Sequence, residues 1–277
     1  MRDGTNIYHV KPSNIHNIAM HIRCCNVLPG YGDDKHQEKT IILIGLMGTG
    51  KSTLIDAMIN YIAGVSFFDD YRFKLVHLTE EEKTKHERWS TSQTNGITCY
   101  RIPWRSGSRV DYKLCVIDTP GFGNYSVEDE TITSMLKCLF EKGIGNIDAI
   151  CLVVPLSSQP DKAGKFLLLN IFKHLFSKDI YDIIYLFLTW DDGGENNVFD
   201  VLKKYIPIEQ DMCFRFNNCD VLRTSHSNEH SIKIWRTRNR SFCGFFRKLL
   251  TTPSISLSNT KAVLDSKSQI ERVLEKT

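Results

Sequence analysis

The sequence predicts an α/β fold built on a doubly wound, mostly parallel sheet with one antiparallel edge strand. Residues 40–44 form a β-branched apolar run that leads through a glycine-rich loop into apolar positions with helical spacing at 54–62. Apolar runs and helical repeats then alternate as far as residue 216, which is typical of a parallel sheet covered by helices on both faces. Residues 97–102 and 112–117 are separated by a turn containing Ser-Gly-Ser, which predicts an antiparallel hairpin at the sheet edge.

Length and chain-breaking residues divide the sequence into one domain with two appendages. The chain has 277 residues, enough for one large core. Residues 1–39 are polar, weakly periodic and interrupted by proline and glycine, so we expect a partly irregular N-terminal lead-in. Residues 40–250 carry the alternating strands and helices of the domain. Residues 251–277 form a C-terminal tail whose apolar spacing is compatible with a helix.

The remaining elements follow in order from the spacing of their apolar residues. The charged stretch 79–90 predicts a solvated loop between the first helix and the hairpin. Beyond the hairpin, helical repeats and shorter apolar runs succeed one another. The predicted helices are 132–140, 168–175, 198–205 and one beginning near 242, and the predicted strands are 149–154, 183–188 and 212–216.

Composition and charge predict a soluble cytoplasmic protein without bulk affinity for nucleic acid. Hydrophobic residues make up 42% of the chain and charged residues 24%, as in ordinary globular proteins. The net charge of +3 is too small to favour nucleic-acid binding. The nine cysteines are an odd number scattered through apolar runs, which favours reduced thiols. The first residues lack an apolar signal core, and the most apolar stretch, 166–190, is too interrupted by charges to span a bilayer.

Residues 45–52 read Gly-Leu-Met-Gly-Thr-Gly-Lys-Ser and match the phosphate-binding pattern G-x-x-x-x-G-K-[ST]. The glycines let backbone N–H groups close around phosphate oxygens, Lys51 brings a cation to the β- and γ-phosphates, and Ser52 supplies a hydroxyl to Mg²⁺. The strand before the loop and the helix after it are the context that this pattern requires, because the helix N-terminus favours an anion. The candidate ligands of the nucleotide are Gly45, Met47, Gly48, Thr49, Gly50, Lys51, Ser52 and Thr53.

An aspartate at the end of a later apolar strand narrows the chemistry. Residues 113–117 lead into Asp118-Thr-Pro-Gly121, which puts a carboxylate at the carboxyl edge of the sheet beside the phosphate loop. Asp118 is expected to hold Mg²⁺ through its water shell, and the Gly121 N–H to meet the γ-phosphate. Lys51 and Gly121 are therefore candidate catalytic groups. Loss of the γ-phosphate would release the following loop, which is a switch mechanism.

The choice of base is expected to lie at the end of the strand 183–188. GTPases carry Asn/Thr-Lys-x-Asp there, because a carboxylate accepts two hydrogen bonds from guanine and adenine offers no matching donors. Thr189 and Asp192 fit this spacing, and Asp191 is the alternative reader in a shifted register. Trp190 replaces the lysine whose stem covers the base, and its indole could cover the base by stacking.

At this point the chain resembles septin-like and AIG1 (GIMAP)-type GTPases over about residues 40–250. The resemblance is carried by the phosphate loop and by residues 92–100, 118–123, 189–193 and 216–218, in that order. It implies that Thr98, with Thr94 as runner-up, is the switch threonine that contacts Mg²⁺ and the γ-phosphate. It also implies that Asn217 or Asn218 lies beside the base, and that copies pair or assemble into oligomers through the nucleotide face.

The predicted function is therefore a GTP-binding switch that hydrolyses GTP slowly with Mg²⁺. Ser52, Thr98 and Asp118 are the expected metal ligands, and Lys51, Thr98 and Gly121 the expected catalytic residues. Phe122 stands where a water-orienting glutamine would speed hydrolysis, so activation by dimerisation or by a partner is expected. Two alternatives are a guanine-nucleotide scaffold that never hydrolyses and an ATP-using P-loop enzyme.

Two further patterns in the sequence allow more than one interpretation. Residues 233–248 are rich in lysine and arginine, which fits either contact with a membrane surface or a helix that packs its aromatic side and leaves a basic face in water. The packed helix is the favoured interpretation. Cys213, Cys219, His226 and His230 lie close in sequence, but their spacing is not that of a zinc finger.

Overall fold

The computed structural model describes most of the domain predicted from the sequence. The described residues are 5–28, 35–76, 94–123, 127–156, 178–194, 197–222 and 229–258, with single positions 176, 260, 262 and 266. The predicted helix 168–175, the charged loop 79–90 and most of the tail 251–277 lie outside them. Within the described residues no helix is long and apolar enough to cross a bilayer.

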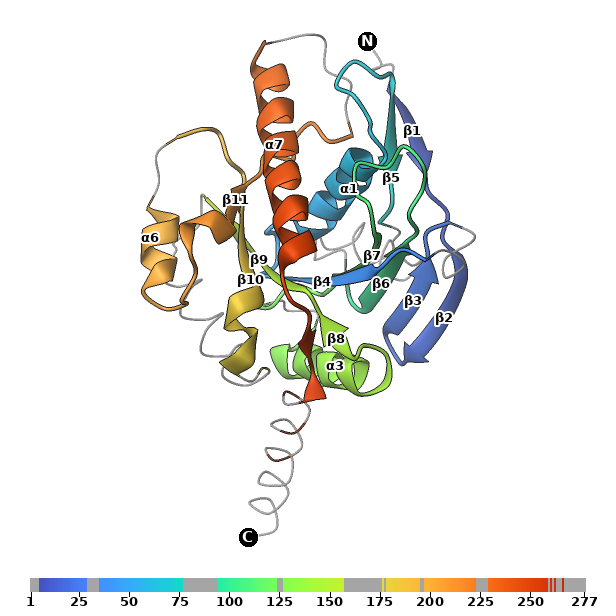
Figure 1. Ribbon diagram of the computed structural model, residues 1–277, viewed down its shortest axis with the longest axis vertical. Helices are drawn as coiled ribbons and strands as arrows, with labels where there is room; N and C mark the ends of the chain where they lie inside the picture. Colours follow the sequence, from blue (N-terminus) through green and yellow to red (C-terminus); the bar gives the residue numbers. More distant parts are fainter. Residues whose placement is uncertain are drawn as a thin grey trace.

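An eight-stranded sheet forms the centre of the molecule (Figure 1). The spatial order of its strands is β11-β10-β9-β4-β7-β6-β3-β2. The strands are β2 (Ser13–Ala19), β3 (Ile22–Asn26), β4 (Glu38–Ile44), β6 (Ile97–Ile102), β7 (Lys113–Asp118), β9 (Ala149–Pro155), β10 (Ile184–Thr189) and β11 (Cys213–Arg215). Two small sheets pair β1 (Asn6–His9) with β5 (Tyr71–Lys74) and β8 (Asn146–Ile147) with β12 (Ile255–Ser256).

The predicted fold class is confirmed, with a difference at the hairpin. Strands β11, β10, β9, β4 and β7 are parallel, and β6 runs antiparallel to β7. The hairpin, however, is not at the edge: β3 pairs in parallel with β6, and β2 pairs antiparallel with β3. The prediction of a single antiparallel edge strand was therefore wrong, because two further strands from the N-terminus extend the sheet.

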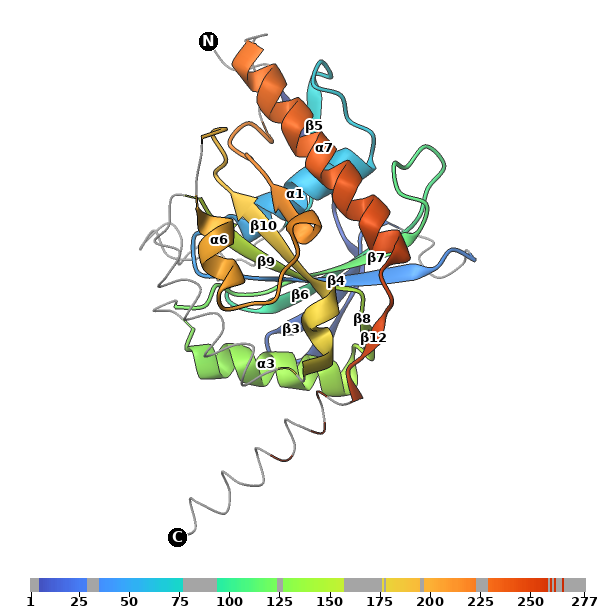
Figure 2. The same cartoon turned by 60° about the vertical axis from the view of Figure 1, so that its left-hand side comes forward.

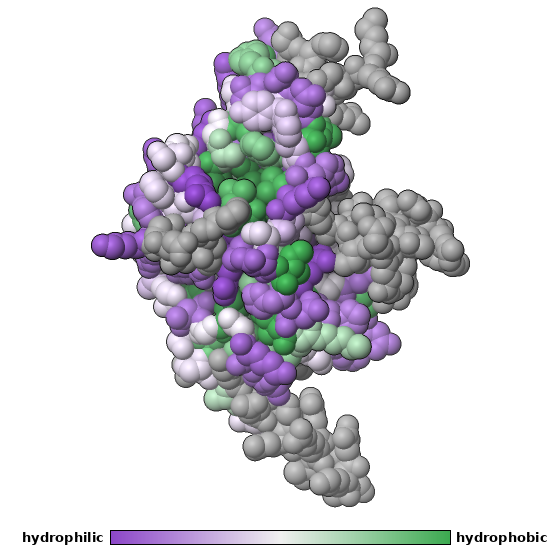
Figure 3. All heavy atoms as spheres, turned by 90° about the vertical axis from the view of Figure 1, so that its right-hand side faces the viewer, coloured by the Kyte–Doolittle hydropathy of each residue, from purple (hydrophilic) through white to green (hydrophobic). Residues whose placement is uncertain are grey.

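Residues 1–39, predicted as a partly irregular lead-in, supply these strands. Ile22, Cys24, Cys25 and Val27 are all at most 2% exposed and lie in the core. These strands could not be predicted from apolar periodicity, because every residue of β2 is exposed or half-buried. The pairing of β2 with β3 also departs from regular register. Figure 3 views the molecule from the side on which β2 and β3 lie in Figure 1, and shows hydrophobic patches between hydrophilic groups on that face.

Helices cover both faces of the sheet. The helices are α1 (Lys51–Ile62), α3 (Asp129–Lys142), α6 (Val198–Lys203) and α7 (Glu229–Thr251), with 3-10 turns at Lys178–Ile183 and Gln210–Met212. In Figure 2, α3 lies below the sheet while α1 and α7 lie side by side above it. The core accordingly has two clusters: α3 packs against one, and α1 and α7 complete the other.

Helix α7 packs its aromatic side and exposes its basic side, as favoured from the sequence. Trp235, Phe242, Phe245 and Phe246 are buried, with Phe245 against Phe187 of β10 at a ring distance of 4.8 Å. The helix begins at Glu229, much earlier than the predicted start near 242. Its basic residues Lys233, Arg236, Arg240 and Arg247 are exposed.

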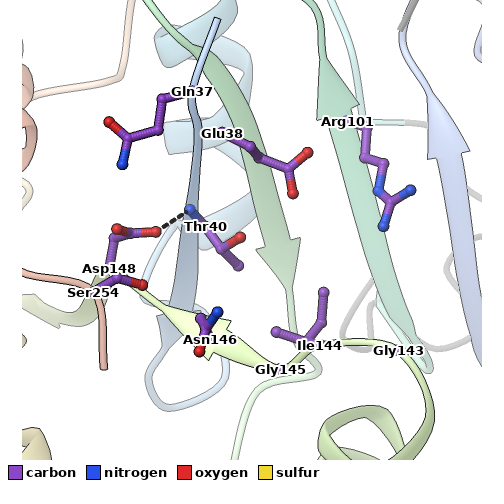
Figure 4. A pocket seen from close by; sticks show the side chains of 10 residues that line it. All are labelled: Gln37, Glu38, Thr40, Arg101, Gly143, Ile144, Gly145, Asn146, Asp148 and Ser254. Carbon is purple, nitrogen blue, oxygen red and sulfur yellow. Dashed lines mark hydrogen bonds between the residues drawn. The ribbon is translucent and has the colours of Figure 1, made fainter. Parts of the chain in front are cut away.

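A buried ion pair fastens the end of α7 to the sheet. Lys39 Nζ lies 3.0 Å from Asp148 Oδ1 and also donates to the Thr252 carbonyl at 3.1 Å. Asp148 Oδ2 accepts from the Thr40 N–H at 2.7 Å. Next to this pair a polar cleft of about 400 Å³ opens at the start of β4, with Glu38 and Arg101 pointing toward one another (Figure 4). The phosphate loop follows the other end of β4.

Candidate functional site

The phosphate loop joins β4 to α1 in the geometry that the sequence predicts. Gly50 adopts φ 86°, a left-handed conformation that favours glycine, and α1 begins at the next residue, Lys51. A Cβ added to Gly50 would meet no atom within 4 Å. The loop therefore surrounds open space in front of the helix N-terminus, where free N–H groups and the helix dipole favour an anion.

Lys51 is held inside the loop by backbone carbonyls. Its Nζ donates to the Gly45 and Leu46 carbonyl oxygens, both at 3.1 Å. Burial lowers the pKa of Lys51 to about 8, and the nearby negative charge of Asp118 opposes that change. A cation in this position lacks a full counter-charge, so a phosphate group would stabilise it.

Three oxygen-bearing side chains meet at the start of α1. Asp118 ends β7 and is 1% exposed, and its Oδ2 accepts from Ser52 Oγ at 3.1 Å. The Thr94 hydroxyl lies 3.2 Å from the same Ser52 oxygen. Hydroxyl and carboxylate oxygens are the ligand type that Mg²⁺ prefers. The structure thus brings Ser52, Asp118 and Thr94 together beside the loop.

Thr98, the preferred switch threonine of the sequence analysis, has a different partner. It lies within β6 directly across from Asp118, and its Oγ1 accepts from Arg23 Nε at 2.8 Å. The hydroxyl at Ser52 belongs to the runner-up, Thr94, three residues before β6 begins. Of the two candidates, Thr94 is thus the one whose hydroxyl meets Ser52, whereas the Thr98 side chain is bound to Arg23 of β3.

Gly121 and Phe122 bind directly to the phosphate loop. The Met47 N–H donates to the Phe122 carbonyl at 2.9 Å, and the Phe122 N–H donates to the Gly45 carbonyl at 3.2 Å. A Cβ on Gly121 would lie 2.5 Å from Met47 Cα, so only glycine allows this approach. The Phe122 side chain is 1% exposed and packs in the core.

The end of β10 reaches the other side of the loop. Thr189 Oγ1 donates to the Thr49 carbonyl at 2.8 Å. Trp190 follows with φ 59° and is 56% exposed. A cleft there is lined by Gly50, Thr53, Thr189, Trp190, Asn218 and Cys219. It continues the phosphate loop toward an aromatic wall, as a site for a nucleoside would.

The two aspartates after Trp190 differ in their surroundings. Asp191 is buried, and its Oδ1 accepts from Arg215 Nη2 at 2.6 Å and from the Gly193 N–H at 2.9 Å. Asp192 is exposed and accepts from the Gly194 N–H at 3.0 Å. Asp191 therefore stabilises the loop, while the Asp192 side chain remains accessible.

The two asparagines after β11 also separate. Asn217 Nδ2 donates to the Asp191 carbonyl at 2.8 Å, which joins the loops after β10 and β11. Asn218 lines the cleft with Trp190. Of the zinc candidates, Cys213 is in β11, Cys219 lines the cleft, and His226 lies outside the described residues. Among described residues no group of three His, Cys, Asp or Glu could hold a metal ion.

Sequence reasoning missed Arg23 and Arg215. Arg23 lies on β3, a strand that the sequence did not predict, and bonds to Thr98, 75 positions away on the neighbouring strand. Arg215 directly precedes the Phe-Asn-Asn segment. The one hint in the sequence was that Arg215 and Cys213, two residues apart on β11, share a face of that strand.

Comparisons with known proteins agree with this geometry. Residues 36–158 match the family model of the elongation factor Tu GTP binding domain. No curated protein matches the chain. Toc33 from Arabidopsis thaliana in complex with Mg²⁺ and GMPPNP is similar with a TM-score of 0.52 and 13% identity, over 80% of this chain and 88% of that one. A dimerisation-deficient mutant of Toc33 gives 0.50 and 13% identity, over 78% and 85%. The chain thus has the fold of a P-loop GTPase domain.

Proposed function

We propose that this protein binds GTP and hydrolyses it slowly with Mg²⁺, as a nucleotide-dependent switch of the septin/AIG1-like kind. The observation that carries the proposal is the meeting of Ser52, Asp118 and Thr94 at the start of α1, beside the buried Lys51. The match of residues 36–158 to a GTP binding domain supports it.

The residues present fit a magnesium nucleotide. Gly50 leaves open space for phosphate oxygens, and the cleft beside Trp190 adjoins that space where a base would lie. Ser52 and Thr94 would hold the metal directly, and Asp118 through its water shell, which replaces Thr98 in the predicted set. Bound Mg²⁺ would neutralise charge on the β- and γ-phosphates.

Each residue of the site would have a separate role in binding or hydrolysis. Lys51 would move from its two loop carbonyls to the phosphates and stabilise negative charge there. The Gly121 N–H, held against Met47, is the candidate sensor of the γ-phosphate. Thr189 links the end of β10 to the phosphate loop by its hydrogen bond to the Thr49 carbonyl. Asp192 is the candidate residue for hydrogen bonds to guanine. Trp190 would cover the base by stacking.

Slow turnover is proposed because Phe122 places no polar group near the attacking water. Its N–H and its carbonyl both form hydrogen bonds with the phosphate loop, and its ring is buried. A side chain so fixed in the core does not orient water. Faster hydrolysis would then require a group from another molecule. A mutant of Toc33 is described as dimerisation-deficient, which implies that Toc33 itself forms dimers. We propose that this chain also forms dimers, through its nucleotide face.

Nucleotide binding is the first test. The wild type and a Lys51→Ala/Ser52→Ala double variant would be titrated with a fluorescent GDP analogue and Mg²⁺, with Thr133→Ala on α3 as a control. Binding should fall at least about a hundredfold in the double variant, because phosphate and metal contacts are lost together, and should be unchanged in the control. Equal binding by all three proteins would contradict the proposal. Competition by ATP as strong as that by GDP would favour the ATP-using alternative.

The scaffold alternative is favoured by the buried Phe122. Single-turnover hydrolysis of GTP at low and high protein concentration separates the two functions. Phosphate release that rises with protein concentration supports an enzyme activated by pairing. No release at either concentration supports a scaffold that uses the nucleotide only to hold its oligomer together.

Two further features of the setting are proposals of the same kind. The nine cysteines, all within the described residues, include none in a disulfide, which supports a cytoplasmic location. Within residues 233–248, the exposed basic side chains of Lys233, Arg236, Arg240 and Arg247 support contact with an anionic membrane surface through charge alone, since Arg238 and the aromatic side of α7 are buried. Sedimentation with anionic but not neutral vesicles would test that contact.

A further inference from the structure

The turn between β2 and β3 lies directly against the segment that leads into β6. The Ile97 N–H donates to the His21 carbonyl at 2.8 Å. Gly96 approaches so closely that a Cβ there would lie 2.5 Å from the same carbonyl oxygen. The N-terminal hairpin therefore fixes the backbone two to three residues after Thr94, whose hydroxyl is at Ser52.

One residue of this hairpin reaches across to the switch strand with its side chain. Arg23 of β3 is the register partner of Thr98 of β6, and Thr98 is the register partner of Asp118 of β7. Register partners project to the same face of a sheet, so these three residues form one lateral row. Arg23 Nε donates to Thr98 Oγ1 at 2.8 Å, and Asp118 Oδ2 accepts from Ser52 at 3.1 Å. The row ends at the proposed metal site.

We propose that Arg23 is a positioning residue for GTP hydrolysis. Through Thr98 and the start of β6, it holds Thr94 over Ser52 when the triphosphate is bound. The inference rests on the proposed function. An arginine suits the role because its guanidinium stays charged and donates in a fixed plane, so it restrains direction as well as distance. Reaction rates are sensitive to displacements of about 1 Å, which can cost about a hundredfold.

The position of this row predicts a selective effect. GDP lacks the γ-phosphate that the switch threonine would contact, so its binding depends on the phosphate loop and the base cleft and not on Arg23. GTP and its analogues depend on both. A residue that merely supported the fold would weaken the two nucleotides alike.

The test compares Arg23→Ala, Arg23→Lys and Thr98→Val in the full chain with Ser13→Ala. Ser13 Oγ bonds to the Asn26 carbonyl at the far end of the same hairpin, so its loss perturbs the hairpin without touching the row. Three quantities are measured: the single-turnover rate with GTP, the affinities for GDP and a non-hydrolysable GTP analogue, and amide hydrogen exchange at residues 97–100 without nucleotide.

Arg23→Ala and Thr98→Val should each lower the rate by about tenfold or more, with GDP affinity within about twofold of wild type. The preference for the GTP analogue over GDP should fall with the rate, and exchange at 97–100 should rise. Arg23→Lys should recover part of the loss. An Arg23→Ala/Thr98→Val double variant should lose little more than either single variant, and Ser13→Ala should match wild type.

Several results would overturn the role of Arg23. One is a wild-type rate and nucleotide preference in Arg23→Ala, and another is an equal loss of GDP and GTP-analogue binding. If wild type binds nucleotide without hydrolysing it, the nucleotide preference and the exchange data decide in the same way. If wild type binds no guanine nucleotide, the proposed function and this inference both fail.

Discussion

Asp191 and Asp192 are neighbours in the sequence but make different contacts, and the difference bears on which of them could contact a base. Asp191 is bound by Arg215 and by the Gly193 N–H, and its exposure is only 8%. Asp192 accepts a local hydrogen bond from the Gly194 N–H and is exposed. The spacing of the motif predicts Asp192 as the residue that contacts the base. Because the Asp191 carboxylate already has two partners, its surroundings favour Asp192 over Asp191 for this contact.

The two aspartates can be separated by conservative substitution. Asp192→Asn should weaken GDP binding by at least about tenfold and shift preference toward xanthine nucleotides, because the amide donates where guanine also donates. Asp191→Asn should instead lower the free energy of unfolding by about 1–3 kcal/mol through its charged hydrogen bond. Nucleotide competition and urea unfolding measure the two effects. The opposite assignment of effects would identify Asp191 as the reader.

Lys51 predicts a pH dependence of binding. Its pKa in the free protein is about 8, below the ordinary 10.5, so it is losing its proton above pH 8 while an unfolded chain keeps it. The unfolded state then binds more protons, and the contribution of Lys51 to stability rises with pH between about 8 and 10.5. A bound phosphate favours the charged lysine. GDP binding should therefore take up protons at pH 9 and few at pH 7.

Calorimetric titration in buffers of different ionisation enthalpy measures this uptake. A binding enthalpy independent of the buffer at pH 9 would show that Lys51 keeps its proton in the free protein.

Trp190 offers an optical measure of the base cleft. It is one of four tryptophans and is 56% exposed beside Thr53 and Asn218. A stacked base should quench its emission, and Trp190→Phe should abolish most of the change while retaining binding. Fluorescence titration with GDP checks this, with inorganic phosphate as a ligand that cannot stack. An unchanged signal in Trp190→Phe would place the base elsewhere.

At the scale of elements, local patterns were read correctly and distant pairings were not. The passage from β4 through the loop to α1 depends on neighbours in sequence, so periodicity and glycine placement predicted it. The same holds for Asp118 at the end of β7. Strand β2 has no buried face, and β3 pairs with a strand more than 70 residues later. Neither strand could therefore be predicted from an alternation of apolar and polar residues. The contacts of Thr94 and Thr98 could be distinguished only once the pairing of β6 with β3, which gives Thr98 its Arg23 partner, was known.

The ion pair between Lys39 and Asp148 connects β4, the segment before β9 and the end of α7. Its side chains are 3% and 4% exposed. Asp148→Ala leaves the Lys39 charge buried and the Thr40 N–H without this acceptor, so the free energy of unfolding should fall by about 3–5 kcal/mol. GDP affinity should be unchanged, because the site lies at the other end of β4.

Urea unfolding and GDP titration measure the two quantities. The control is Asp111→Ala, whose side chain is 86% exposed beside His36 and should contribute little. Equal stability of the two variants would show that the buried pair is no anchor.

At the scale of the whole molecule, the match to a GTP binding domain begins at residue 36, but the folded unit begins earlier. A fragment 36–277 lacks the strands that cover β6 and loses buried Ile22, Cys24, Cys25 and Val27. It should be insoluble or unfold without cooperativity, because an open strand edge and an uncovered core remain. A fragment 5–277 is the control. Circular dichroism and thermal melting distinguish them, and a stable fragment 36–277 would make the hairpin dispensable.

The order of strands also limits how other proteins can read the nucleotide state. A strand that follows a switch segment is useful to a partner when its edge is open, since an extended segment can add to it by backbone hydrogen bonds. Here β3 and β2 already occupy that side of β6. A partner approaching this edge meets β2 instead, two strands away from the switch. The hairpin of this chain thus occupies the edge where a partner's extended segment would otherwise add to β6.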